Sequence, residues 1–158
     1  MGTNQRNLVR MSDEEVDAYL SVHRAAAMAT LGPDGLIHQV AMYFDWFDGA
    51  VHVLSKAKAQ KIVNLRRDPR CSFHVESGTT YAELAGVNLA GRAELIEDEE
   101  MLWEIGKRIA VRRHGAYDES QRGEVAAVLR NRVGVRLRPQ RIVSWDHSKL
   151  PAGSYPSG

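Results

Sequence analysis

The segment with the clearest capacity for chemistry is LSKAKAQKIVNLRRDPR, which spans Leu54–Arg70. It leaves a predicted strand at Ser55 and enters a predicted helix over Ala57–Arg67. The first backbone N–H groups of a helix have no partner within it, and the helix dipole adds partial positive charge at that end. Together with the Ser55 hydroxyl and nearby ammonium groups, this junction predicts a phosphate-binding site. The ammonium groups belong to Lys56, Lys58 and Lys61.

The lysines of this helix allow two interpretations. At about 100° per residue, Lys58, Ile62 and Leu65 share one arc of the predicted helix, and Lys61 lies at its edge. Helical side chains lean toward the N-terminus, so both lysines would reach back toward a bound phosphate. The alternative is a solvated basic face beside Arg66, Arg67 and Arg70. The pattern alone leaves both open.

Other reactive side chains do not form a recognisable catalytic or metal-binding set. His38, His52 and His74 lie on three different predicted strands, and none has a second histidine or cysteine at ligand spacing, so no metal site is expected. Cys71 begins a strand on its apolar side and is expected to be a core residue. The catalytic residues stay unassigned, with Tyr43 or His38 as candidate proton sources.

The elements that position the Leu54–Arg70 segment are mostly strands. We expect a flexible arm over residues 1–11, one domain over residues 12–147 and a tail over residues 148–158. Strands are predicted over residues 25–31, 36–46, 50–55, 71–76, 81–96, 132–137 and 141–145, and helices after Ser12 and over residues 57–67, 97–113 and 119–130. The strands are too close together for helical crossovers, which indicates a largely antiparallel barrel of about six strands with helices outside.

Composition excludes several classes of protein. The chain of 158 residues has a net charge of +1, which argues against a dedicated nucleic-acid binder. No apolar run approaches the length of a membrane span, and the N-terminus has no secretory pattern. With a lone cysteine, the expected location is the cytoplasm.

The chain resembles the flavin-binding split-barrel family, which includes pyridoxamine-phosphate oxidases and coenzyme F420-dependent oxidoreductases. The resemblance covers about Ala25–Trp145 and is carried by VHVLSKAKAQKIVNLRRDPR, NLAGRAELIED and RIVSWDH. It implies a mainly β fold with flanking helices, a six-stranded antiparallel split β-barrel. It also implies a homodimer in which each cofactor touches both subunits.

In that family, the strand end and the first helical turn bind the cofactor phosphate, and the preceding strand lines the ring system with its backbone. Carried over by position, the expected cofactor-binding residues are Gln39, Val40, Ala41, Met42, Leu54, Ser55, Lys56, Lys58, Lys61, Ile62 and Asn64.

Two departures from the pyridoxamine-phosphate oxidase pattern favour the F420 branch. Gln60 stands where those oxidases have an arginine, and SKLPAGSYPSG lacks their arginine-rich C-terminal motif. F420 carries a phosphodiester and a polyglutamate tail, which a basic strip of Lys56, Lys58, Arg66 and Arg67 would suit. FMN is the alternative cofactor.

The resemblance therefore implies an F420-dependent oxidoreductase that transfers a hydride between the deazaflavin and a small organic acceptor. The alternatives are an FMN-dependent oxidoreductase or oxidase of the same fold and a non-catalytic flavin or F420 carrier, with a haem-degrading relative more distant. A small-molecule substrate is expected, and neither nucleic acid nor a membrane is an expected partner.

Overall fold

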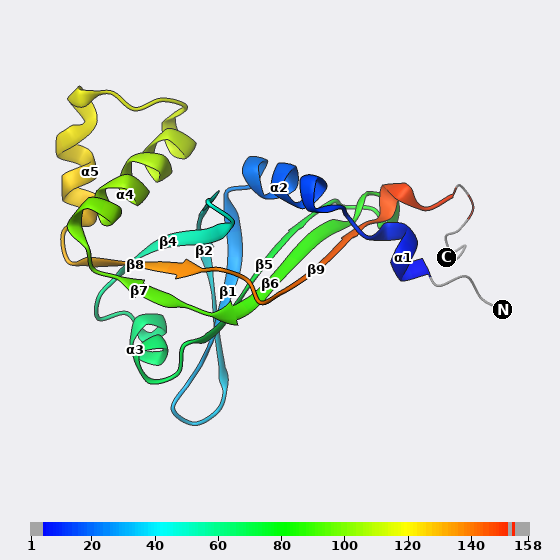
Figure 1. The fold of residues 1–158 in the computed structure, drawn as a ribbon, viewed down its shortest axis with the longest axis horizontal. Coiled ribbons are helices and arrows are strands. Elements are labelled where there is room, and N and C mark those ends of the chain that lie inside the picture. Colours follow the sequence, from blue (N-terminus) through cyan, green and yellow to red (C-terminus); the bar gives the residue numbers. More distant parts are fainter. Residues whose placement is uncertain (1–4, 152, 154–158) are drawn as a thin grey trace.

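The computed structural model describes residues 5–151 and 153. Nine strands within this part form two antiparallel sheets, one in the order β2-β1-β5-β6-β9 and the other in the order β3-β4-β8-β7 (Figure 1). The strands are β1 (Ala25–Leu31), β2 (Ile37–Tyr43), β3 (Asp45–Phe47), β4 (Ala50–Lys56), β5 (Arg70–Ser77), β6 (Ala85–Arg92), β7 (Glu94–Ile96), β8 (Arg132–Leu137) and β9 (Arg141–Asp146). The α-helices are α1 (Gln5–Val9), α2 (Asp13–Val22), α3 (Gln60–Arg67), α4 (Glu99–His114) and α5 (Arg122–Leu129). The predicted mainly β fold with flanking helices is confirmed.

The structure has nine strands where about six were expected for the barrel, because two of the seven predicted strand ranges break and change sheets. The first breaks at Phe44, between β2 and β3, where the Phe44 N–H donates to the Arg24 carbonyl at 3.0 Å. The second breaks at Ala93, between β6 and β7, where the Ala93 N–H donates to the Pro69 carbonyl at 2.8 Å. The start of that second prediction, residues 81–83, is a 3₁₀ turn. Each break moves the chain from the five-stranded sheet into the four-stranded one.

The core lies between the two sheets and follows the alternation of the strands. Met28, Phe73 and Leu89 occupy paired positions on β1, β5 and β6 and are fully buried. Val53 and Val135 are paired in the other sheet and are also fully buried. One face of the five-stranded sheet therefore packs inward, as expected for an antiparallel sheet with a single covered face.

The N-terminal elements pack beside the end of β9. The Ser12 hydroxyl accepts from the Glu15 N–H at 3.2 Å and the Ser12 N–H donates to the Glu15 carboxylate at 2.6 Å, so the predicted capping signature at the start of α2 is confirmed.

Within the predicted arm, residues 5–9 form α1, and the Met11 N–H donates to Ser144 Oγ at 3.2 Å. The mobility of the arm stays a prediction, and its residues 1–4 lie outside the described part.

The C-terminal segment follows β9 directly. Residues 147–149 form a 3₁₀ turn, and Lys149 Nζ donates to the Arg10 carbonyl at 3.0 Å. Residues 152 and 154–158 of the predicted tail lie outside the described residues. In the part that the structure describes, no helix has the length and apolar character needed to cross a membrane.

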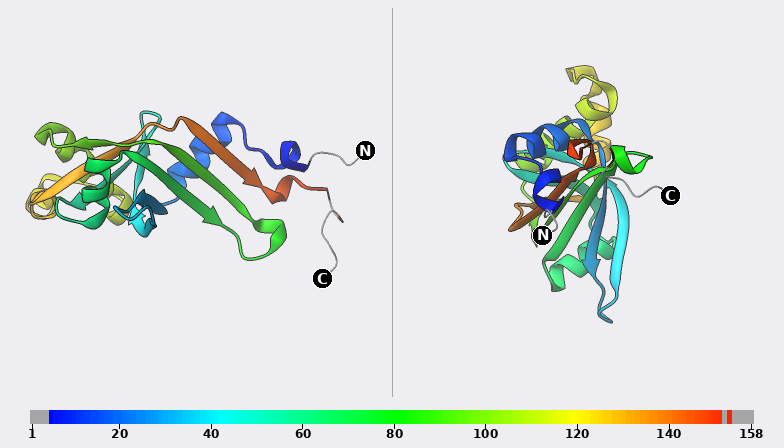
Figure 2. Two further views of the ribbon diagram at one scale, coloured as in Figure 1. Left: turned by 90° about the horizontal axis from the view of Figure 1, so that it is seen from below. Right: turned by 90° about the vertical axis from the view of Figure 1, so that its right-hand side faces the viewer.

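The α4–α5 pair lies at the end of the molecule opposite α1 (Figures 1 and 2). The helices correspond to the predictions for residues 97–113 and 119–130, with the start of the second as a 3₁₀ turn. They approach closely because Gly106 faces Val125, where an added Cβ would lie 3.0 Å from the valine Cγ1. The end of α5 borders the turn between β4 and α3, since Ala127 and Val128 line one pocket with Lys56 and Lys58.

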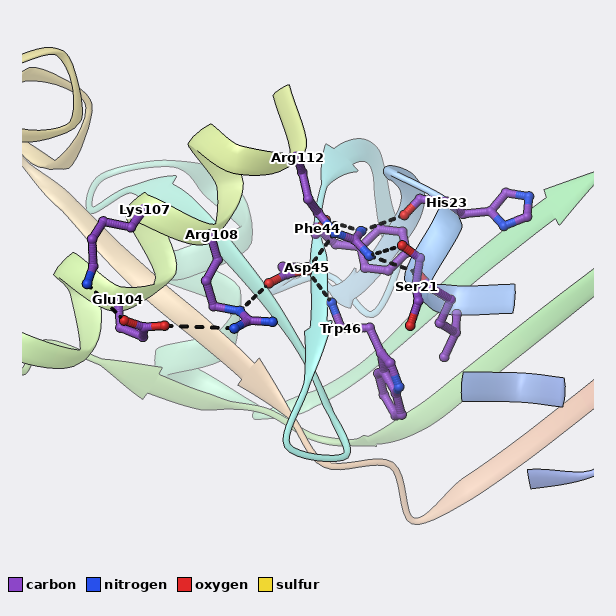
Figure 3. Close-up of polar contacts among 10 residues, drawn as sticks. Ser21, His23, Phe44, Asp45, Trp46, Glu104, Lys107, Arg108 and Arg112 are labelled. Atoms are coloured by element: carbon purple, nitrogen blue, oxygen red, sulfur yellow. Dashed lines mark hydrogen bonds and ion pairs between the residues drawn. The ribbon is translucent and has the colours of Figure 1, made fainter. Parts of the chain in front are cut away.

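A buried ion cluster fastens α4 to the barrel (Figure 3). The carboxylate of Asp45, which is 3% exposed, lies 2.6 Å from Arg108 Nε and 2.6 Å from Arg112 Nε. Arg112 also donates to the backbone carbonyls of Leu20, Ser21, His23 and Phe44. One guanidinium therefore joins α4, the end of α2 and the break between β2 and β3.

Candidate functional site

The junction between β4 and α3 differs in one respect from the sequence-based prediction. β4 continues to Lys56, because the Ala57 N–H donates to the Asn131 carbonyl at 3.0 Å and extends the pairing with β8. The Ala59 N–H then donates to the Lys56 carbonyl at 3.0 Å and closes a turn. The helix begins at Gln60, three residues later than predicted. The prediction that Lys58 lies on the helix was therefore wrong, and Lys58 lies in the turn before it.

The start of α3 has no side-chain cap. Ala59 occupies the N-cap position with extended backbone angles, and no side-chain hydrogen bond forms there. Its carbonyl accepts from the N–H groups of Ile62 and Val63 at 2.9 and 3.1 Å. Serine, threonine, aspartate or asparagine is usual at this position because an oxygen satisfies the first amides of the helix. The positive end of the dipole is thus available to an anion.

Positive side chains surround this end of α3. Lys61 is half-buried, and its pKa is lowered by desolvation and, to a smaller extent, by the neighbouring Arg132 guanidinium. Lys56 and Lys58 are exposed. Within residues 5–151, none of these four side chains forms an ion pair with a carboxylate. The corner therefore brings uncapped backbone amides together with several cations, the groups that the predicted phosphate site requires.

Asn64 and Gln60 connect this corner to the five-stranded sheet. Asn64 is fully buried, its Nδ2 donates to Thr30 Oγ1 at 3.0 Å, and its Oδ1 accepts from Gln60 Nε2 at 2.8 Å. Thr30 on β1 is paired with His38 on β2. The start of α3 is thereby held beside β1 and its neighbour β2. The Asn64 side chain serves this connection rather than facing outward toward a ligand.

The predicted ring-lining residues lie on β2, the outermost strand of its sheet. Gln39 and Ala41 are exposed, whereas Val40 and Met42 are half-buried. One edge of β2 pairs with β1, so the other edge offers backbone N–H and C=O groups that could bind the polar edge of a planar ring.

The remaining predicted site residues lie in the interior. Ile62 is fully buried, Ser55 is 2% exposed and Leu54 is 7% exposed. Their side chains contribute to the shape and packing of the corner, and the exposed cations Lys56 and Lys58 form its surface.

The structure adds two residues that the sequence analysis did not assign to binding. Arg132 on β8 lies opposite Lys56 and close enough to Lys61 to lower its pKa, after the larger effect of burial. His38 has a buried Nδ1 without a hydrogen-bond partner among the described residues. The inward position of His38 was visible in the strand pattern. The position of Arg132 depends on the register of β4 and β8, which has no local sequence signal.

The other candidate groups are unsuited to nucleophilic or metal chemistry. Burial raises the pKa of the Cys71 thiol to about 12. Burial lowers the pKa of His52 to about 4. Within residues 5–151 and 153, no three His, Cys, Asp or Glu side chains are grouped so that they could hold a metal ion. No catalytic acid, base or nucleophile is assigned.

Comparison with known proteins identifies the family. Residues 12–146 match the family described as Pyridoxamine 5'-phosphate oxidase. A conserved hypothetical protein from Mycobacterium tuberculosis has a solved structure that is 42% identical, with a TM-score of 0.90 over 98% of each chain. Comparison with curated proteins found no match.

Two more distant solved structures share the fold. One is named F420 reductase and is 21% identical, with a TM-score of 0.63 over 85% of this chain and 96% of its own. The other is a FAD-binding protein from Mesorhizobium loti, 19% identical, with a TM-score of 0.61 over 85% of this chain and 94% of its own. From the family match over most of its length, the chain belongs to the pyridoxamine 5'-phosphate oxidase family and has its split β-barrel fold.

Proposed function

We propose that this protein is a coenzyme F420-dependent oxidoreductase that works on a small organic molecule. The observation that carries the proposal is the uncapped start of α3 beside Lys58, Lys61 and Arg132, none of which has a carboxylate partner within residues 5–151. This is an environment for a phosphate group. The free edge of β2, the strand next to the β1 strand to which Asn64 of α3 is hydrogen-bonded, suits a planar ring.

The deazaflavin, when bound, would supply the hydride chemistry. The chain's own residues would bind and orient it. Lys58, Lys61 and the first amides of α3 would hold the phosphate, and the free edge of β2 would hold the ring. Since no acid or base is built into this corner, a proton would come from solvent or from a nearby group such as His38, whose Nδ1 is buried and has no partner among the described residues.

We further propose that the protein is a homodimer that pairs through the outer face of the five-stranded sheet. Across all five strands, one row on this face consists of Ala41, Ala27, His74, Asn88 and Val143. The face also carries exposed apolar side chains, since Ile37 is 70% exposed, Tyr43 56% and Val143 50%. A second copy would cover these groups, and small side chains between them permit close approach.

FMN is the second candidate cofactor, because it also ends in a phosphate and the family includes pyridoxamine 5'-phosphate oxidases. Gln60, which donates to Asn64, favours F420 over FMN because the oxidases carry an arginine at this position. A non-catalytic carrier would bind F420 without turnover.

The test is a fluorescence titration of the purified protein with F420 and with FMN, followed by a turnover assay with quinone, enone and tetrapyrrole acceptors. The double substitution Lys58→Ala with Lys61→Ala should weaken F420 binding by about a hundredfold or more, because each lost charge-assisted contact contributes roughly 1.5–3 kcal/mol. Arg66→Ala serves as the control, because Arg66 pairs with Glu97 at 2.7 Å and is not free to bind a ligand.

Unchanged affinity in the double variant would exclude the phosphate site. Binding of FMN with no binding of F420 would mean that FMN, and not F420, is the cofactor. Binding of F420 without turnover of any acceptor would support a carrier.

A further inference from the structure

A pocket of about 500 Å³ lies on the outer face of the five-stranded sheet, at the end where β1 and β6 finish and β5 and β9 begin. Its floor is a row of paired residues, Ala29 on β1, Ser72 on β5 and Ala90 on β6. Arg141 on β9 continues the same row. The small side chains of the floor leave depth for a ligand, and the volume is typical of a site for a small molecule.

The two sides of this pocket differ in chemistry. Toward β2 the lining side chains are apolar, since Leu31 at the end of β1 is paired with Ile37. Toward β9 they are basic, with Arg70 on β5, Arg92 on β6 and Arg141 on β9. Among the described residues that line the pocket, none is acidic. A ligand that fills it would therefore have an apolar body and an anionic end.

Two of the three arginines have no carboxylate partner. Arg70 and Arg92 are directly opposite in the register of β5 and β6, where like charges destabilise a sheet. The nearby Asp68 is already engaged, because its two carboxylate oxygens accept from Arg70 at 3.0 and 2.6 Å. Within residues 5–151 and 153, Arg92 and Arg141 form no ion pair. Their guanidinium groups are therefore available to the oxyanion of a ligand.

The apolar side of the pocket adjoins the strand expected to hold the cofactor ring. Ala29 of the floor is paired with Gln39 on β2, and neighbouring strands lie about 5 Å apart. From β1 to β9 the pocket crosses three strand spacings, a distance of about 14 Å. A molecule that spans the pocket would place its apolar end beside the ring and its anionic end at the arginines.

We propose that this pocket binds the electron acceptor, and that the acceptor is an organic acid whose carboxylate is bound by Arg92 and Arg141. This inference rests on the proposed function. The acceptor would gain a hydride from the reduced cofactor and a proton from solvent, so that it is reduced by two electrons and the cofactor is oxidised by two. In the proposed dimer, the second copy would cover this face and exclude water from the pocket.

The binding test uses biphenyl-4-carboxylate and biphenyl-4-carboxamide, which share an apolar body and differ in charge. Calorimetric titration of the full chain should show the acid bound about tenfold more tightly than the amide. High salt should reduce this preference, because Arg92 and Arg141 are exposed and salt screens their charges. Equal affinities for the two probes at low salt would overturn the inference.

Substitution of either arginine should remove most of the preference for the acid. Arg92→Gln and Arg141→Gln should leave the affinity for the amide nearly unchanged. Arg92→Gln also removes the like-charge pair with Arg70, so no loss of stability is expected, and thermal unfolding checks both variants. Arg138→Gln is the matched control, because Arg138 pairs with Asp48 and does not line the pocket. The preference for the acid should persist in this control.

Turnover separates this inference from the proposed cofactor. With F420 as the cofactor, a naphthoquinone that carries a carboxylate side chain should have a kcat/KM about tenfold higher than its uncharged amide. Arg141→Gln should remove this difference.

Equal kcat/KM for the two quinones, or a preference for the acid that survives in both arginine variants, would overturn the inference and leave the proposed cofactor in place. Failure of F420 to bind would instead overturn the proposed function, and the acceptor role of the pocket with it.

Discussion

At the scale of single residues, burial decides which groups can bind or titrate. Lys61 is half-buried beside Arg132, and both effects favour loss of its proton, yet no carboxylate within residues 5–151 compensates for its charge. Asn64, by contrast, is fully buried and uses its amide for two internal hydrogen bonds. Two residues of the same predicted site thus have different roles: Lys61 is available to a ligand, and Asn64 stabilises the fold.

His52 should make the stability of the protein depend on pH. Burial lowers its pKa to about 4, from an ordinary value of 6.5. Between these values the unfolded chain binds a proton that the native protein does not, so the free energy of unfolding decreases as the pH falls through this range. The expected loss is roughly 3 kcal/mol, from about 1.4 kcal/mol per pKa unit.

Urea denaturation at about pH 7 and about pH 4, in wild-type protein and His52→Gln, measures this contribution. The variant should lose less stability on acidification than the wild type. An equal loss in both proteins would show that His52 is not the group responsible.

At the scale of elements, the start of α3 lacks the cap that would stabilise the helix, and the same lack leaves its first amides available to an anion. Alanine is a poor N-cap, and its place at residue 59 leaves the first amides of the helix without a side-chain acceptor. A carboxylate here would satisfy those amides and would occupy the position of a bound phosphate. Ala59 is therefore informative as a site of substitution.

We expect Ala59→Asp to raise the free energy of unfolding by about 1 kcal/mol and to weaken F420 binding by about tenfold or more. Denaturation and fluorescence titration measure the two effects. Ala59→Gly is the matched control, because glycine adds no side-chain oxygen and no charge, although it is a better N-cap residue than alanine. A more stable variant with unchanged affinity would mean that the start of α3 does not contact the ligand.

The attachment of α4 depends chiefly on Arg112. This side chain pairs with the buried Asp45 carboxylate and donates to four backbone carbonyls, whereas Arg108 is more exposed and its hydrogen bond is to Asp45. Arg112→Ala should lower the free energy of unfolding by about 3–5 kcal/mol, the usual cost of breaking a buried pair. Arg108→Ala should cost less, because Arg112 still compensates for Asp45.

Chemical denaturation of both variants tests this order. Arg112→Lys should recover only part of the loss, since an ammonium cannot reproduce the planar contacts of a guanidinium. Equal losses for Arg108→Ala and Arg112→Ala would contradict the central role of Arg112.

At the scale of the whole molecule, the outer face of the five-stranded sheet determines the expected assembly. Its central row combines small side chains with the exposed Val143, and the exposed Ile37 lies on the same face at the end of β2. Specific interfaces bury about 800 Å² per partner, which a face of five strands can supply. Pairing through this face would also bring a second copy beside β2, the strand expected to line the cofactor ring.

Val143→Asp should convert the dimer to monomers, because a charge would have to be buried at the interface. Light scattering coupled to size-exclusion chromatography should then give half the wild-type mass. Val111→Asp, on the exposed surface of α4, is the control and should stay dimeric. A wild-type monomer, or a dimer that Val143→Asp leaves intact, would refute this assembly.

The sequence by itself determined most of the elements of this protein. Strand alternation and turn residues located β1, β4, β5, β8 and β9 to within about two residues, and the Ser12 capping signature marked the start of α2. The cationic junction between β4 and α3 was also predictable, because a run of lysines after a strand is a local feature. The family resemblance extended this to a split barrel, which the family match bears out.

Only the tertiary structure decided where strands change sheets, where α3 begins and which cations meet. At Phe44 and Ala93 the N–H groups still bond to the Arg24 and Pro69 carbonyls in the register of the five-stranded sheet, and from the next residue the chain pairs in the four-stranded sheet. Lys58 lies before the helix because β8 extends the pairing of β4 past its predicted end. The pairing of Lys56 with Arg132 likewise depends on register between strands far apart in sequence. Local propensity carries no information about such partners, since they are chosen by the packing of the whole barrel.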